Sequence, residues 1–106
     1  MAYFHLKLLP PRSTFPHDAT PAEMAAMQEH AVYWQGNADQ GKALAVGPVF
    51  AEGGAWGMAL VEAGDASEAQ AIADADPVIT AGLGFRFEIA PIPSLILRRD
   101  LAGTAV

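Results

Sequence analysis

Residues 55–77 read AWGMALVEAGDASEAQAIADADP and contain a strand, a turn and a short helix. Large apolar residues at 56, 58 and 60 alternate with smaller ones at 57, 59 and 61, which is the two-residue period of a strand. Either Asp65 or Ser67 can cap the helix that follows, and we expect this helix to run to about Ala75. Pro77 disfavours helical dihedral angles at Asp76, so the helix has to end there.

A second strand precedes this stretch. Residues 42–50 read KALAVGPVF, a short apolar run, and Glu52-Gly53-Gly54 supplies a turn into the strand at 55–62. Gly47-Pro48 interrupts the run, and a proline within a strand is confined to sheet edges and bulges. The two segments therefore predict a hairpin whose first strand is bent.

The N-terminal part predicts one strand and one long helix. Residues 2–9, AYFHLKLL, alternate between polar and apolar side chains until a proline pair stops them. Thr20-Pro21-Ala22-Glu23 combines a capping hydroxyl, a proline at the first position and a glutamate three residues after the cap, which is typical of a helix start. We expect the helix to reach about Gln40 and to stop at Gly41. Its apolar stripe consists of Met24, Met27, Ala31, Trp34 and Ala38.

The C-terminal part adds a brief helical turn and a last strand. The turn covers residues 77–81, and the strand covers 85–90, with Phe85, Phe87 and Ile89 on one face. We expect Pro91 and Pro93 to end this strand. Residues 1–93 are thus predicted to form one domain, and residues 94–106 a partly ordered C-terminal extension.

The order of these elements predicts an α+β fold. It matches the ferredoxin-like split β-α-β-β-α-β arrangement, a four-stranded antiparallel sheet with two helices on one face. We expect the uncovered sheet face to carry Tyr3, His5, Val61 and several small side chains. Two chains stacked sheet against sheet would cover it, so we predict a homodimer, reinforced by residues 94–99 packing across the partner.

Composition excludes several classes of protein. The chain has 106 residues, enough for one domain, and its twelve acidic and six basic residues give a formal charge of −6. This charge repels phosphate backbones and anionic membrane surfaces, so neither nucleic acid nor membrane is expected as a partner. There is no cysteine, hence no disulfide and no thiolate, and the N-terminus does not resemble a signal peptide. We expect a cytoplasmic protein.

His30 and Asp76 are the candidates for chemistry. His30 falls at the edge of the apolar stripe, and a histidine there suits proton transfer if a partner fixes its tautomer. Asp76 points toward the core side of its helix and, with Pro77 after it, can cap the next helical turn. Capping uses one carboxylate oxygen, and the other can accept from His30 as the orienting half of a dyad. Capping alone and a boundary histidine without a role are the alternative readings.

Other groups give weaker signals. His5, His17 and His30 lack the spacing that places two metal ligands on one helix face, so no metal is expected. The glycines match neither a dinucleotide fingerprint nor a phosphate loop, and no cofactor is predicted. The polar face of the first strand can line a pocket, although a solvated or dimer-facing strand is the commoner case.

Several short motifs together resemble the YCII-related (YciI-like) family over roughly residues 3–92. They are Glu29-His30, Tyr33-Trp34, Gly41-Lys42-Ala43-Leu44, Gly47-Pro48, the run AIADADP at 71–77, and Ala81-Gly82-Leu83. The resemblance implies a ferredoxin-like chain that dimerises into a dimeric α/β barrel. It also implies an active site that pairs the helix histidine, here His30, with the aspartate of the Asp-Pro element, here Asp76. A dehydrochlorinase acting on a chlorinated hydroxyquinol-type aromatic is the catalytic precedent in this family.

The functional expectation is a cofactor-independent enzyme, a lyase or an isomerase, acting on a small substrate for which an aromatic compound is one candidate. His30 and Asp76 are the expected catalytic residues, and Trp34, Gly47, Pro48 and His5 are the expected substrate-binding residues. The alternatives are a non-catalytic module that binds a small ligand in the same pocket, and a structural subunit without a pocket around His30.

Overall fold

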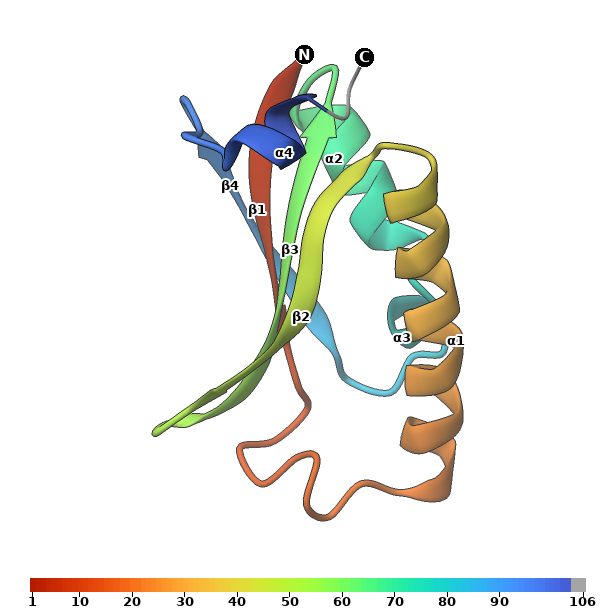
Figure 1. Cartoon of the computed structure of the whole chain (residues 1–106). Coiled ribbons are helices and arrows are strands. Elements are labelled where there is room, and N and C mark those ends of the chain that lie inside the picture. Colours follow the sequence, from red (N-terminus) through yellow and green to blue (C-terminus); the bar gives the residue numbers. More distant parts are fainter. Residues whose placement is uncertain (104–106) are drawn as a thin grey trace.

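The computed structural model describes residues 1–103 and contains one four-stranded sheet with helices packed on one face (Figure 1). The strand order is β2-β3-β1-β4, and each neighbouring pair is antiparallel. This is the ferredoxin-like α+β arrangement that the sequence predicts. The strands are β1 (Ala2–Leu9), β2 (Ala43–Ala51), β3 (Gly54–Ala63) and β4 (Arg86–Ile92), and the helices are α1 (Pro21–Asp39), α2 (Ala66–Asp74), α3 (Pro77–Thr80) and α4 (Arg99–Gly103).

The helix starts follow the capping signals in the sequence. The Thr20 hydroxyl accepts a hydrogen bond from the Glu23 amide at 3.1 Å, and the Glu23 carboxylate accepts one from the Thr20 amide at 2.9 Å. These reciprocal bonds satisfy two amides that the first turn of α1 leaves unpaired. Of the two predicted caps of α2, Asp65 is the one used, through a 2.9 Å bond from the Glu68 amide. Both helices therefore begin where their caps require.

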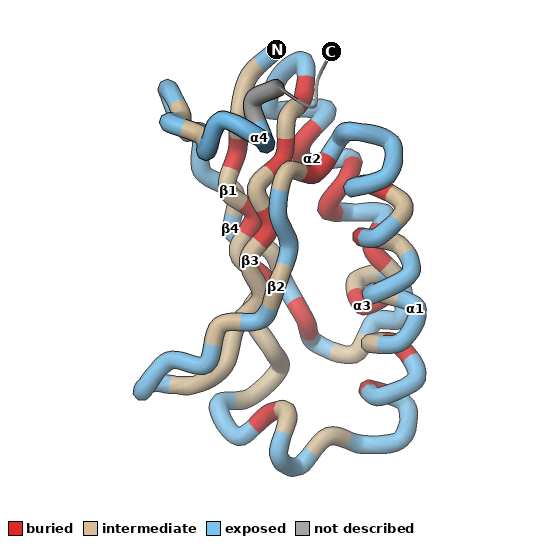
Figure 2. Tube along the Cα trace, viewed as in Figure 1, coloured by how far each residue is buried: buried red, intermediate tan, exposed pale blue. Residues whose placement is uncertain are grey.

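The core lies between the sheet and helices α1 and α2, where buried residues face each other (Figure 2). The sheet contributes side chains such as Phe4 and Leu6 from β1, and the helices contribute Trp34 and Ile72. A second buried cluster surrounds α3 and the start of β4 and includes Phe15, Val78 and Phe85. The candidate site lies where these two clusters meet.

The two faces of β3 are the reverse of our prediction. Val61 is fully buried against the helices and does not lie on the open face. The smaller residues of β3 face the helices, and at Gly57 the neighbouring strand leaves little room for a larger one: a Cβ atom there would lie 3.2 Å from the Cβ of Leu8 in β1. The larger residues Trp56 and Leu60 consequently lie on the face that α1, α2 and α3 leave uncovered, together with His5, which pairs with Leu60.

The packed face of α1 also differs from the predicted stripe. Its buried residues are Glu23, Ala26, Trp34 and Asn37, whereas Met24, Ala31 and Ala38 of the stripe are exposed. His30, predicted at the edge of the stripe, thus lies on the side of the helix that packs. All five stripe residues line a cavity between α1 and the sheet, and Trp34 is the one that also belongs to the core.

Both edge strands contain proline. β2 lies at one edge, as predicted, and its irregularity falls between Ala43 and Ala45, before Gly47-Pro48. Pro91 lies within β4 and does not end it as we expected, because β4 is the opposite edge and an edge strand tolerates a missing amide. Of the predicted extension at 94–106, residues 94–98 are irregular, α4 follows, and 104–106 lie outside the described residues. In the described part of the chain, no helix has the length and apolar character to cross a membrane.

Candidate functional site

His30 and Asp76, 46 residues apart in the sequence, are in direct contact. His30 Nδ1 lies 2.7 Å from Asp76 Oδ2, the hydrogen-bond distance that the dyad hypothesis requires. Asp76 is fully buried, whereas the His30 side chain keeps 15% of its surface exposed. The carboxylate is therefore held inside the protein, and the imidazole connects it to the surface.

Local sequence explains the position of Asp76. Its dihedral angles (φ −62°, ψ 131°) are extended, as expected before a proline, and they place it as the N-cap of α3. Asp76 Oδ1 accepts a hydrogen bond from the Val78 amide at 3.0 Å. One oxygen therefore caps α3, and the other accepts from His30. This is the combination of capping and dyad that the sequence allowed.

Trp34 is the third member of this group, in a role that the sequence analysis missed. Its Nε1 donates a hydrogen bond to Asp76 Oδ2 at 2.8 Å, and the side chain is almost completely buried. With the Val78 amide and His30 Nδ1, it gives the buried carboxylate three N–H partners, which offset the cost of removing the charge from water. The signal in the sequence was the spacing of four residues, which places Trp34 on the same helix face as His30.

Neighbouring aromatic residues restrain this group. The Trp34 ring makes edge contacts with Tyr33 and Phe87 at centroid distances of 5.5 and 6.3 Å. The Tyr33 hydroxyl donates to the Ile72 carbonyl at 2.6 Å and so ties α1 to α2. Burial raises the pKa of Tyr33, and the nearby charge of Asp76 acts in the same direction. Tyr33 therefore acts as a neutral hydrogen-bond donor in the folded protein.

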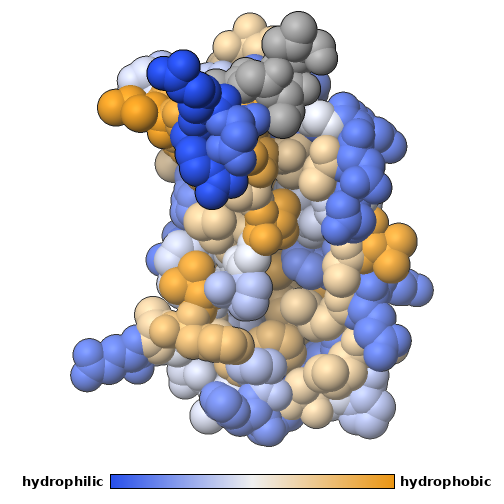
Figure 3. All heavy atoms as spheres, in the orientation of Figure 1, coloured by the Kyte–Doolittle hydropathy of each residue, from blue (hydrophilic) through white to orange (hydrophobic). Residues whose placement is uncertain are grey.

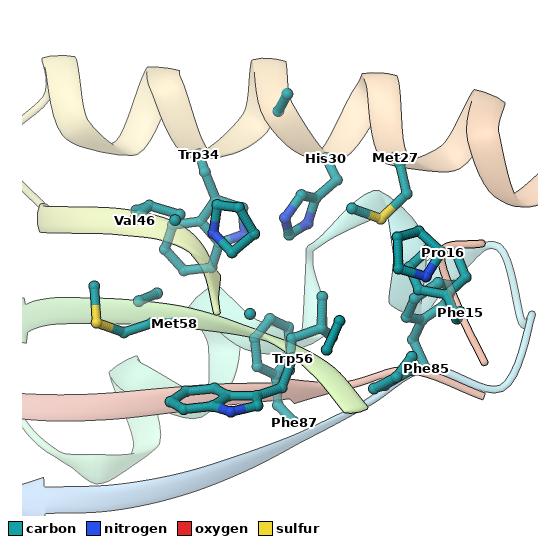
Figure 4. Close-up of a pocket in the computed structure, with 18 of the residues that line it drawn as sticks. Phe15, Pro16, Met27, His30, Trp34, Val46, Trp56, Met58, Phe85 and Phe87 are labelled. Carbon is teal, nitrogen blue, oxygen red and sulfur yellow. The ribbon is translucent and has the colours of Figure 1, made fainter. Parts of the chain in front are cut away.

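A cavity of about 520 Å³ opens beside His30, between α1 and the sheet. In the close-up, the His30 ring projects into it from α1, with Trp34 and Met27 on either side (Figure 4). The outer surface between α1 and β2 carries many apolar residues (Figure 3). With Asp76 at Nδ1, the Nε2 atom is the ring nitrogen left for a molecule in the cavity.

Three of the four expected substrate-binding residues line this cavity: Trp34, Gly47 and Pro48. The fourth, His5, lies on the other face of the sheet, where its ring contacts Trp56 with a centroid distance of 5.8 Å. Strand alternation explains the difference, because the neighbours of His5 in β1, Phe4 and Leu6, point to the helices.

The loop at residues 10–20 closes one end of the cavity and is held by Arg12. The Arg12 guanidinium donates to both Glu23 carboxylate oxygens at 2.7 Å and to Asp18 Oδ2 at 3.0 Å. This bidentate contact lowers the pKa of Glu23 to about 2, with help from the Thr20 amide. Phe15 and Pro16 of the fixed loop form part of the cavity wall. The sequence analysis did not identify Arg12, because nothing local in the sequence pairs it with Glu23.

The described residues contain no cluster of three or more histidine, aspartate or glutamate side chains able to hold a metal ion. The site is thus built from one imidazole, one buried carboxylate, one indole and an apolar cavity. Such a group can accept and return a proton at His30 Nε2, with the charge balanced by Asp76.

Comparison with known families agrees with this architecture. The family model of the YCII-related domain matches residues 9–93, most of the chain. The chain belongs to the YCII-related family. The match spans His30, Trp34 and Asp76 as well as the Gly47-Pro48 element of the candidate site. A search of curated proteins finds no significant match.

Proposed function

We propose that this YCII-related protein is a cofactor-independent enzyme that uses His30 and Asp76 to transfer a proton on a small substrate, an aromatic one being a candidate. The observation that carries the proposal is the 2.7 Å contact between His30 Nδ1 and a fully buried carboxylate, at the wall of an apolar cavity. A buried acceptor at Nδ1 selects the tautomer in which Nε2 carries the lone pair.

The chemistry follows from that tautomer. His30 Nε2 takes a proton from a C–H or O–H group of the substrate, and the resulting imidazolium is stabilised by the Asp76 carboxylate. The electron pair left on the substrate then has two outcomes. If it expels a leaving group, the reaction is an elimination; if His30 returns the proton to another atom, the reaction is an isomerisation.

The experiment is a turnover screen with enolisable and halogenated aromatic compounds, comparing the wild type with His30→Gln. The matched control is His5→Gln, which changes a histidine on the opposite face of the sheet. We expect turnover that is lost in His30→Gln and kept in His5→Gln. Equal background rates in all three proteins, together with thermal stabilisation by one of the compounds, would instead favour the alternative, a non-catalytic ligand-binding module.

We also propose that the protein acts as a homodimer, with two sheets stacked through their open faces. The support is the set of large side chains on that face: Trp56, Met58 and Leu60 of β3, beside His5 and Lys7 of β1. Lys7 Nζ lies 4.8 Å from the centre of the Trp56 ring, so part of this face is already packed within the chain. A second copy would remove its apolar surface from water.

A further inference from the structure

We infer that the ligand of the cavity is an uncharged, extended apolar molecule about three rings in size, with its proton-bearing group near the middle. This inference rests on the proposed function for the role of His30, but the size and charge of the ligand come from the cavity itself. The inference restricts the proposed substrate to neutral, apolar molecules of about three rings.

Volume sets the size. A protein cavity of about 150 Å³ holds one benzene molecule, and the cavity beside His30 is about 520 Å³. It is thus more than three times as large, and it falls within the range of pockets that enclose drug-sized ligands. A single ring would leave most of the apolar wall in contact with water.

The lining sets the charge. The residues that line the cavity include no aspartate, glutamate, lysine or arginine, and His30 and Gln35 are the main polar side chains among them. Phosphate, carboxylate or ammonium groups on a ligand would lose their hydration there without gaining an ionic partner. The carboxylate that contacts His30, that of Asp76, already accepts three N–H groups. A neutral ligand is therefore favoured over a charged one of the same shape.

The position of His30 sets where the reacting group lies. Figure 4 shows Trp34 and Val46 on one side of the His30 ring, and Met27, Pro16, Phe15 and Phe85 on the other. The cavity therefore has two apolar ends with the imidazole between them. A ligand that fills both ends brings its central part to His30 Nε2.

The two ends differ in rigidity. At the loop end, Phe15 and Phe85 pack edge to face with centroids 5.2 Å apart, and the ion pair between Arg12 and Glu23 fixes the loop that carries Phe15. Phe50 of β2 and Met24 of α1 also line the cavity, yet 73% and 48% of their surfaces are exposed. These exposed apolar side chains mark an entrance between α1 and the edge strand β2, suited to an apolar molecule.

The test uses two fluorescent compounds that share one three-ring skeleton. N-Phenyl-1-naphthylamine is neutral, and 8-anilinonaphthalene-1-sulfonate adds one sulfonate. Binding is measured in about 0.5 M salt, which screens the negative surface charge of the protein. We expect the neutral compound to bind at least about tenfold more tightly than the anion, and the single-ring N-methylaniline to compete at least about tenfold more weakly.

Site-directed variants locate the binding. Met27→Trp fills the loop end of the cavity and should weaken binding of the neutral compound about tenfold or more. Val32→Trp is the matched control, because it adds the same indole to α1 at a position that is 74% exposed. Equal binding of the two fluorophores, or unchanged binding to Met27→Trp while Val32→Trp behaves as wild type, would overturn the inference.

The same assay separates this inference from the proposed function. Binding of the neutral fluorophore needs no proton transfer, so His30→Gln should retain it within about threefold. If binding behaves as expected but no neutral three-ring compound with an acidic proton is turned over, the proposed enzyme function fails and the ligand class stands. If compounds are turned over but charged or single-ring ones are preferred, the ligand class fails and the enzyme function stands.

Discussion

Trp34 lies one helical turn after His30, and the two side chains donate to the same oxygen of Asp76. The indole is buried and the imidazole is partly exposed, so one donor is fixed by the core and the other faces the cavity. Trp34 therefore acts as a positioning residue, which holds the carboxylate while His30 exchanges its proton at Nε2. This arrangement makes predictions for each member of the group.

Trp34→Phe should lower the free energy of unfolding by about 2–4 kcal/mol, because it removes a hydrogen bond to a charged group and leaves a cavity. Chemical denaturation measures the change. Trp56→Phe is the matched control for losing an indole, since Trp56 lies on the open face and makes no bond to Asp76. If Trp34→Phe lowers the free energy of unfolding no more than Trp56→Phe does, the indole of Trp34 does not hold the Asp76 carboxylate.

Asp76→Asn should cost about 2–4 kcal/mol of stability although it changes few atoms. Both carboxylate oxygens accept N–H groups, so the amide nitrogen of asparagine has to face a donor whichever way it turns. Asp74→Asn is the control, because Asp74 is exposed and accepts a surface bond from Gln70. Its unfolding free energy should stay within about 0.5 kcal/mol of the wild type.

The ion pair between Arg12 and Glu23 predicts a pH dependence. The pKa of Glu23 is about 2 in the folded protein, against an ordinary value of 4.5. The pair therefore contributes its full stability above pH 4.5, and this contribution is lost as the pH falls toward about 2. The melting temperature of the wild type should exceed that of Glu23→Gln near neutral pH, and the gap should narrow as the pH falls. A gap that stays constant across this range would contradict the assignment.

Leu60→Glu should convert the proposed homodimer to a monomer, because it places a charge in the centre of the open sheet face. Val32→Glu, on the outward side of α1, is the control and should remain dimeric. Sedimentation of the wild type at 11.1 kDa, the mass of one chain, would reject the dimer. A dimer that survives Leu60→Glu would reject this face as its interface.

Local signals in the sequence were sufficient for much of the fold and for the central pair. The caps at Thr20 and Asp65 and the proline after Asp76 act within a few residues, so they predict helix starts and ends. The contact between His30 and Asp76 followed from helix geometry together with a family resemblance. These features needed no knowledge of how distant elements pack.

The features that the sequence did not reveal depend on tertiary packing. Alternation in β3 separates two faces but does not say which one meets the helices, and Val61 was consequently placed on the wrong side. The bond from Trp34 to Asp76 and the pairing of Arg12 with Glu23 likewise require side chains from separate elements to meet. The cavity lies beside α1 because, of its apolar stripe, Trp34 packs into the core whereas Met24, Ala31 and Ala38 stay exposed.

The protonation of the two His30 nitrogens is the sharpest test of whether His30 and Asp76 form a proton-transfer pair. A long-range proton–nitrogen NMR correlation on the neutral imidazole distinguishes the two tautomers. We expect Nδ1 to carry the proton and donate it to Asp76, and Nε2 to be unprotonated and to shift when a ligand enters the cavity. A proton on Nε2 with Nδ1 bare would contradict this expectation, because His30 could then neither donate to Asp76 nor accept a proton from the substrate.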